Sequence, residues 1–218
     1  FESIEKIREQ LLSNHNTIEI EDFGAGSRKG LTKKRKVCEI ANSSLKPKKF
    51  AQLLFRMINY YQPETILELG TSLGVTSAYL ASAKPDATLI TMEGSASIAS
   101  IAKNNLNQLN LKNVRVVEGN FDETLSNTLS KVQQIDFAFL DGNHRYQPTI
   151  DYFNQVLEKS TENTIIVIDD VHWSKEMEQA WVYIKQHPQV TLSIDLFFIG
   201  IIFLRKEFKI KQDFVICF

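Results

Sequence analysis

Two apolar segments of the chain, Ile135–Asp141 and Thr164–Asp169, end in aspartates that could hold a cation, and Asp170 follows directly. If the segments are neighbouring parallel strands, their carboxyl ends meet at one edge of a sheet and the carboxylates converge. Converging carboxylates raise one another's pKa unless a cation neutralises them, and an all-oxygen ligand set suits Mg²⁺ or another hard divalent cation. The sequence therefore predicts a metal site formed by Asp141, Asp169 and Asp170.

A second chemical pattern surrounds the apolar segment Thr65–Leu69. Glu68 stands near its end, Gly70 follows it, and Gly74 comes four residues later. Gly70 allows a tight turn, and Gly74 lets a ligand or the following helix approach the backbone closely. The spacing differs from the Gly-x-Gly-x-x-Gly of dinucleotide sites. A carboxylate at Glu68 would repel a phosphate but would attract a sulfonium or ammonium group.

The stretch Glu68-Leu-Gly-Thr-Ser-Leu-Gly74 resembles the first motif, E-x-G-x-x-x-G, of class I S-adenosylmethionine-dependent methyltransferases. The resemblance covers about residues 60–205 and implies S-adenosylmethionine as cofactor. It places the methionine end near the first motif, the ribose at Glu93, and the adenine near Asn120 and Phe121. The full set of cofactor-binding residues that it implies is Glu68, Gly70, Thr71, Ser72, Gly74, Glu93, Gly94, Asn120, Phe121 and Asp141.

The metal residues resemble those of catechol-type and caffeoyl-CoA-type O-methyltransferases. Asp141 and Asp169 fall on the two aspartate ligands of these enzymes, whereas Asp170 replaces their asparagine and adds a negative charge. His144 falls where the catechol-type enzymes carry a general-base lysine, so we expect His144, with Asp141, to act in catalysis. The Asp-Gly-x-His pattern also resembles a broad bacterial methyltransferase group for which no metal is implied. His172 is the alternative base, and either histidine could instead be a structural hydrogen-bonding residue.

Apolar strand patterns and amphipathic helix patterns alternate from residue 64 onward, which predicts an α/β fold with a parallel, doubly wound sheet. Expected helices lie near 74–83, 96–109, 121–131, 146–159 and 174–187. Two final strands, Val190–Leu196 and Phe198–Arg205, have no helix between them and predict an antiparallel last strand. The resemblance implies a Rossmann-like, seven-stranded sheet in the order 3-2-1-4-5-7-6.

Residues 1–62 are expected to form an N-terminal helical extension or lid, and residues 63–218 the S-adenosylmethionine-binding domain. Helical patterns cover Ser3–Ser13, Arg35–Ser43 and Pro47–Tyr61, and the loop Asp22–Arg28 contains glycines that could hinge a lid. The run 28–36 carries six basic residues in nine. A solvated loop or the recognition of an anionic substrate would both account for that run.

Overall composition limits the kind of partner. The formal net charge is −1 and 43% of residues are hydrophobic, so nothing global favours nucleic acid or a membrane surface. No window has the roughly 18 apolar residues of a membrane span. Cys38 and Cys217 lie far apart and indicate reduced thiols. We expect a soluble, cytoplasmic protein that acts on a small-molecule acceptor, and a homodimer is compatible with the resemblance.

The sequence thus predicts methyl transfer to a hydroxyl oxygen with Mg²⁺ assistance. A metal-independent methyltransferase acting on nitrogen or a carboxylate, with His144 or His172 as base, is the nearest alternative. A non-catalytic cofactor-binding module is a second alternative. An NAD-dependent oxidoreductase is a third, which the glycine spacing and the terminal hairpin disfavour.

Overall fold

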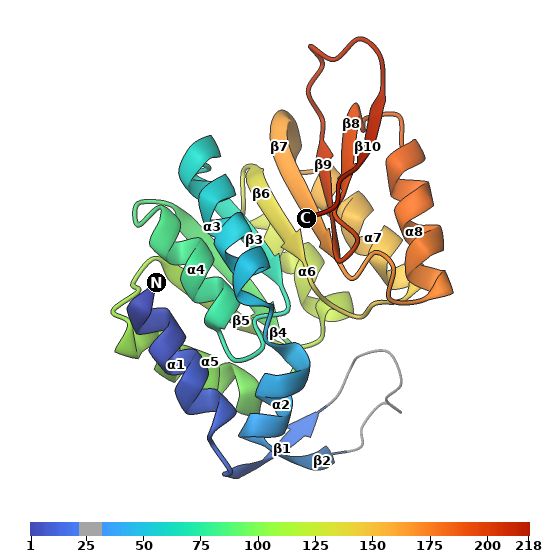
Figure 1. The fold of residues 1–218 in the computed structure, drawn as a ribbon. Coiled ribbons are helices and arrows are strands. Elements are labelled where there is room, and N and C mark those ends of the chain that lie inside the picture. The colour runs from blue at the N-terminus through green and yellow to red at the C-terminus, as the bar shows by residue number, and fades with distance from the viewer. Residues whose placement is uncertain (22–31) are drawn as a thin grey trace. The chain divides into compact units, whose positions relative to one another are not determined.

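The computed structural model describes residues 1–21 and 32–218 (Figure 1). These residues divide into two compact units. The first unit comprises Phe1–Glu64 and Gly70–Phe121, and the second comprises Thr65–Leu69 and Asp122–Phe218. The proposed glycine lid at 22–28 and residues 28–31 of the basic run lie outside the described residues.

The first unit contains five helices and four strands among its described residues. Along the chain these are α1 (Glu2–Leu12), β1 (Thr17–Glu21), β2 (Thr32–Lys36), α2 (Val37–Ser44), α3 (Lys48–Tyr61), α4 (Val75–Ala83), β4 (Thr88–Glu93), α5 (Ala96–Gln108) and β5 (Val114–Glu118). Strands β4 and β5 pair in parallel, with α5 as the crossover between them. This βαβ arrangement is the one that the alternating sequence pattern predicts.

The N-terminal helices bury one stripe of side chains each. In α3 the buried residues Phe50, Ala51, Leu54, Met57 and Ile58 recur with helical spacing. The helix ends at Gln62, a left-handed residue whose N–H donates to the carbonyl of Ile58. In α1 the buried apolar residues join a core cluster with α4 and α5. Burial of these stripes anchors the extension to the rest of the first unit.

The expected helix at Arg35–Ser43 is wrong at its start, because residues up to Lys36 belong to a strand. β2 pairs antiparallel with β1, and α2 begins only at Val37. The sequence of β1 is acidic and that of β2 is basic. Across the pair, Lys34 Nζ lies 3.5 Å from Glu19 Oε1. Cross-strand charge pairing of this kind favours the ribbon over continuation of the helix.

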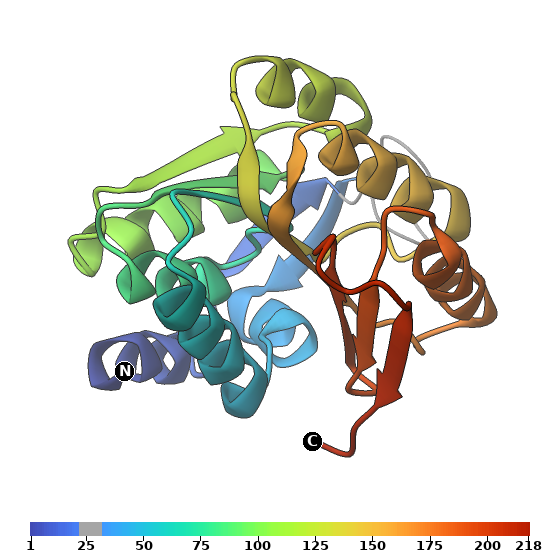
Figure 2. The same ribbon diagram turned by 90° about the horizontal axis from the view of Figure 1, so that it is seen from above.

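The second unit contains β3 (Thr65–Leu69), most of α6 (Phe121–Ser130), and the remaining elements toward the C-terminus. These are β6 (Ile135–Leu140), α7 (Tyr146–Leu157), β7 (Ser160–Asp169), α8 (Lys175–Gln186), β8 (Leu192–Asp195), β9 (Ile199–Phe203) and β10 (Gln212–Val215). Within this unit the strand order is β10-β8-β9-β7-β6-β3. Helices α7 and α8 pack side by side (Figure 2).

The predicted fold class is confirmed. Strand β9 runs antiparallel to both β7 and β8, whereas β3, β6 and β7 are mutually parallel. The order β3, β6, β7, β9, β8 reproduces the 1-4-5-7-6 part of the expected sheet. The β5–β4 pair of the first unit reproduces its 3-2 part.

Strand β10 was not predicted. It pairs in parallel with β8, and all four of its residues are exposed. Because no face of β10 is buried, no alternation of apolar and polar residues marks it. Side-chain bonds hold it instead: Asp213 accepts from Ser193 Oγ at 2.7 Å and from Lys185 Nζ at 2.7 Å.

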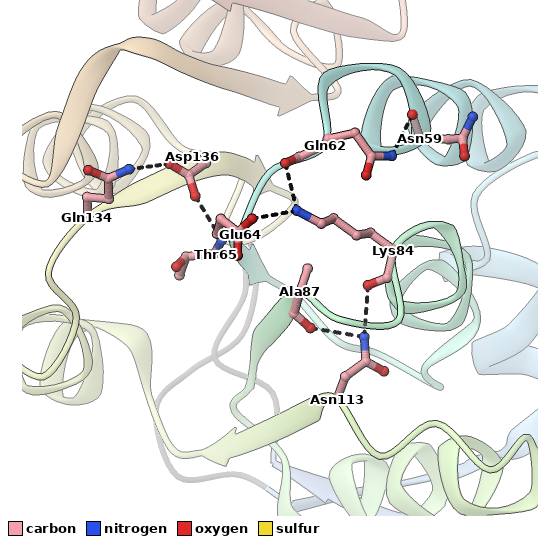
Figure 3. A network of polar contacts seen from close by, with 9 residues as sticks. All are labelled: Asn59, Gln62, Glu64, Thr65, Lys84, Ala87, Asn113, Gln134 and Asp136. Atoms are coloured by element: carbon pink, nitrogen blue, oxygen red, sulfur yellow. Dashed lines mark hydrogen bonds and ion pairs between the residues drawn. The ribbon is translucent and has the colours of Figure 1, made fainter.

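Polar contacts fix the loops at the amino ends of the strands (Figure 3). In the first unit, Lys84 Nζ donates to Gln62 O at 2.9 Å and to Glu64 Oε1 at 2.8 Å. In the second unit, Asp136 Oδ2 accepts from Thr65 N at 2.9 Å. These contacts satisfy loop groups at the ends of the strands remote from the predicted site residues.

Candidate functional site

The turn from Gly70 to Gly74, in the first unit, is built on backbone hydrogen bonds. The N–H groups of Gly70 and Thr71 both donate to the carbonyl of Met92 at 3.0 Å. Gly70, Ser72 and Gly74 have φ values of 99°, 47° and 81°. Two of these positive φ values fall on glycines, the residues that adopt them without steric cost.

The position of Gly74, at the start of α4, leaves little room for a side chain. A Cβ atom built on Gly74 would lie 3.2 Å from the Cα and Cβ atoms of Ala102 in α5. Asn105, also in α5, donates from Nδ2 to the carbonyl of Leu73 at 2.8 Å. The second glycine of the motif therefore serves close packing of α5 against the turn.

The carboxylate of Glu93 ties this turn to the end of β4. Its Oε2 atom accepts from Ser72 N at 2.8 Å, and its Oε1 atom accepts from Ser95 N at 3.0 Å. The Ser72 hydroxyl lies 2.8 Å from that of Ser44, at the end of α2. Glu93 is thus held in a fixed orientation by backbone donors.

The end of β5 joins the same arrangement. Gly119 has a φ of 125°, and its N–H donates to the carbonyl of Glu93 at 2.9 Å. Asn120 and Phe121 follow it, and both are half-buried, as is Gly94. The first unit therefore brings together the loops that carry the residues expected at the methionine, ribose and adenine ends of the cofactor. Glu68 belongs to the second unit, where it is fully buried in β3.

The second unit gathers two carboxylates and an imidazole. Asp141, His144 and Asp169 each offer a ligand atom, and these atoms all lie within 4.8 Å of one another. His144 Nε2 is 3.4 Å from Asp141 Oδ1. Asp169 is fully buried at the end of β7, whereas Asp141 and His144 are half-buried. The convergence of Asp141 with Asp169 is the one that parallel strand ends predict.

Asp170 does not belong to this group of ligand atoms. Its backbone has a φ of 53°, and its N–H donates to the carbonyl of Phe198 at 2.7 Å. Its own carbonyl accepts from Trp173 N at 2.9 Å. The residue after Asp169 therefore turns the chain toward the β8–β9 connection. The sequence-based role of Asp170 as a ligand stays a prediction.

The loop that carries His144 is held in an unusual conformation. Asn143 and His144 have φ values of 65° and 25°, which side-chain-bearing residues adopt infrequently. Asn143 Nδ2 lies 3.3 Å from the hydroxyl of Tyr152, and that hydroxyl donates to Asp122 Oδ1 at 2.6 Å. Burial and the bond to Asp122 raise the pKa of Tyr152, so it remains a neutral donor. These bonds support the backbone that presents His144.

A hydrogen-bonded network around Asp195 was not predicted from the sequence. Asp195 Oδ2 lies 2.8 Å from His172 Nε2 and accepts from Trp181 Nε1 at 2.9 Å, while Oδ1 accepts from Phe197 N at 2.8 Å. Burial raises the pKa of Asp195, but the bonds from Phe197, His172 and Trp181 outweigh it, and the net shift is downward. Asp195 is therefore a buried, ionised anchor.

Aromatic side chains pack around the Asp195 network. The rings of His172 and Phe197 are stacked, with centroids 5.3 Å apart. Phe197 has a φ of 71°, strained for a bulky residue, and its N–H is held by Asp195. A Cβ on Gly200 would lie 2.6 Å from the Trp181 ring, so a glycine is required beneath the indole. The sequence signal that could have revealed the network is an acid at the end of β8, but nothing local points to its partners.

Comparisons with known proteins agree with this geometry. Residues 67–171 match a family model described as a methyltransferase domain. A comparison with curated proteins finds no significant match. Among solved structures, the fold is similar to that of an O-methyltransferase from Bacillus cereus in complex with S-adenosylhomocysteine, at 23% identity and a TM-score of 0.64. The match covers 73% of this chain and 82% of that chain.

Two further structures show the same fold. TomG, an O-methyltransferase of Streptomyces achromogenes involved in tomaymycin synthesis and bound to S-adenosylmethionine, is 21% identical, with a TM-score of 0.64. The match covers 74% of this chain and 82% of that chain. The methyltransferase PaMTH1 of Podospora anserina, bound to S-adenosylhomocysteine, is 16% identical, with a TM-score of 0.67. That match covers 76% of this chain and 82% of the other.

These findings confirm the class predicted from the sequence. Residues 67–171 match the methyltransferase-domain model, and the chain has the Rossmann-like fold of the solved methyltransferases. In the part of the chain that the structure describes, no helix combines the length and apolar character needed to cross a membrane.

Proposed function

We propose that this protein transfers the methyl group of S-adenosylmethionine to a hydroxyl oxygen of a small molecule. The observation that carries the proposal is the arrangement at Glu93, whose carboxylate receives N–H groups from the turn after the first motif and from the start of α5. The ribose hydroxyls would bond the carboxylate of Glu93. Gly70, Thr71, Ser72 and Gly74 would hold the methionine end, and Asn120 with Phe121 the adenine.

The acceptor would be prepared by the residues of the second unit. Asp141 and Asp169 fit a divalent cation because they offer convergent carboxylate oxygens. Asp141 and Asp169 would hold the cation, Mg²⁺ in the sequence-based proposal, which would supply a lower pKa and a fixed orientation for the acceptor hydroxyl. In that proposal, His144 takes the hydroxyl proton. The oxygen then displaces the sulfonium, which yields a methyl ether and S-adenosylhomocysteine, so positioning supplies much of the rate.

Calorimetric titration with S-adenosylhomocysteine, in the presence and absence of Mg²⁺, tests the cofactor part. We expect dissociation constants in the micromolar range for the folded protein. Failure of a folded sample to bind would remove the proposal. Screening of hydroxylated acceptors, with and without EDTA, then tests the cation.

One observation favours a second candidate, a metal-independent methyltransferase acting on nitrogen or a carboxylate. His172 lies 2.8 Å from the buried Asp195, a pairing that would orient an imidazole base without a metal. Full turnover of an amine or carboxylate acceptor in EDTA would select this candidate. In either case we propose a reducing, cytoplasmic setting, since Cys38 and Cys217 are free thiols.

A further inference from the structure

The side chain of His144 allows an inference about the cation itself. We propose that His144 is a ligand of the cation rather than the base, and that the site formed with Asp141 and Asp169 prefers a divalent transition-metal ion to Mg²⁺. The proposal rests on the proposed function for the use of the cation. Binding of the metal alone, however, can be measured without cofactor or acceptor.

The distances fit one shared ion. Oxygen and nitrogen ligands lie about 2.0–2.2 Å from small divalent cations, so two ligands of one ion are separated by about 3 Å when adjacent and about 4.3 Å when opposite. His144 Nε2 and Asp141 Oδ1 are 3.4 Å apart, close to the adjacent value. All three ligand atoms lie within 4.8 Å of one another, so small rotamer changes would complete the site.

The donor set decides which ion fits. Two carboxylates and one imidazole form a mixed oxygen and nitrogen set, whereas Mg²⁺ prefers oxygen ligands and retains water. Imidazole suits Zn²⁺, Fe²⁺, Co²⁺ and Ni²⁺, and affinity for such sites rises from Mn²⁺ along the first transition row. The all-oxygen set predicted from sequence required Asp170, which is not among the gathered ligand atoms. With His144 in place of Asp170, the ligand set favours a transition-metal ion over Mg²⁺.

The two roles of His144 exclude each other at one nitrogen. The lone pair of Nε2 can bind a cation or accept a proton, but not both. Asn143 and His144 both have positive φ values, and Asn143 is bonded to Tyr152, so the loop holds the imidazole beside Asp141. An imidazole fixed against a carboxylate that itself faces Asp169 is placed as a third ligand.

The first experiment measures metal binding by the full chain after removal of metals with EDTA. Isothermal titration with MnCl₂, CoCl₂ and MgCl₂ should give Co²⁺ and Mn²⁺ affinities at least tenfold above that of Mg²⁺. His144→Gln should lower the Co²⁺ and Mn²⁺ affinities at least tenfold and leave the Mg²⁺ affinity nearly unchanged. His187→Gln, at the far end of α8, is the matched control and should change none of them.

A second measurement needs no variant. Pulsed electron paramagnetic resonance of the Mn²⁺-loaded wild-type protein should show coupling to a directly bound nitrogen. Absence of that coupling, or equal affinities for Mn²⁺ and Mg²⁺, would overturn the proposal and return His144 to the role of base. S-adenosylhomocysteine titration of the same samples separates the two hypotheses: lost cofactor binding with an intact metal site removes the proposed function and leaves the nitrogen-ligated metal site in place.

Discussion

The two units position the residues of their loops in different ways. The loops of the first unit carry most of the residues expected to bind the cofactor, and those of the second unit carry the acids and histidines. In the first unit, positive φ values at the turn and at the end of β5 fall mostly on glycines, and backbone groups supply most of the bonds. In the second unit, the described residues with positive φ are not glycines: they are Asn143, His144, Asp170 and Phe197.

The difference follows from what each loop must present. A nucleoside and an amino acid can be held by backbone amides, which need glycine so that the ligand can approach. A cation or a proton needs side chains at defined positions, so strained residues must themselves carry the functional groups. The second unit offsets this strain with specific bonds, such as Phe197 N to Asp195 and Asp170 N to Phe198 O.

The largest expected effect is at Asp169. Asp169→Ala should reduce metal-dependent turnover about 100-fold or more, because a charged ligand of the cation is lost. Binding of S-adenosylhomocysteine should remain close to wild type, since Asp169 is not among the residues expected to bind the cofactor, most of which belong to the first unit. Initial rates with a hydroxylated acceptor, alongside calorimetry, measure both. Asp151→Asn, an exposed acid of α7, is the control, and unchanged turnover in Asp169→Ala would remove the metal model.

Glu93→Ala should have the complementary effect in the first unit. Removal of the carboxylate unpairs the N–H groups of Ser72 and Ser95 and removes the acceptor for ribose. We expect S-adenosylhomocysteine affinity to fall by about 1–3 kcal/mol, the usual scale for unpaired hydrogen-bonding groups. Glu93→Gln should keep part of the affinity. Wild-type affinity in Glu93→Ala would show that the ribose assignment is wrong.

Sequence reasoning succeeded where chemistry is local. The strand at Thr65–Leu69 has the predicted bounds, because it is short, largely apolar and followed by a turn. The glycine motif could be identified for the same reason, because its hydrogen bonds join groups within a few residues of one another or groups of the neighbouring strand. Asp141 and Asp169 were paired correctly, because parallel strands bring their carboxyl ends together.

The sequence failed where partners are remote. Asp195 lies 23 residues from His172, and no local pattern reports that the two side chains meet. The entry of His144 into the ligand group depends on a left-handed backbone that a histidine seldom adopts. Strand β10 is held by bonds to β8 and α8 rather than by burial, so its sequence carries no strand signal.

The network of Asp195 should make the stability of the second unit depend on pH. Because the folded pKa of Asp195 lies below its usual value of 3.8, its contribution is present at neutral pH and is lost as pH falls through the folded pKa. Asp195→Asn should lower the free energy of unfolding by about 1–3 kcal/mol at pH 7. The deficit should shrink toward pH 3. Urea unfolding at pH 7, 5 and 3 measures it, and a deficit that is constant with pH would contradict an ionised anchor.

The smallest effect should come from a surface ion pair of the first unit. Lys103 Nζ lies 2.5 Å from Glu118 Oε1, but the two side chains are 45% and 41% exposed, so water screens the attraction. Lys103→Met should therefore change the free energy of unfolding by less than about 1 kcal/mol. Thr91→Val is the informative comparison, because the buried Thr91 hydroxyl lies 2.5 Å from the Thr71 hydroxyl. The substitution removes this hydrogen bond from the Thr71 hydroxyl, at a cost of about 1–3 kcal/mol. If urea unfolding ranks the two variants in the opposite order, the surface ion pair contributes more to stability than the buried hydroxyl pair, and the expected ranking is wrong.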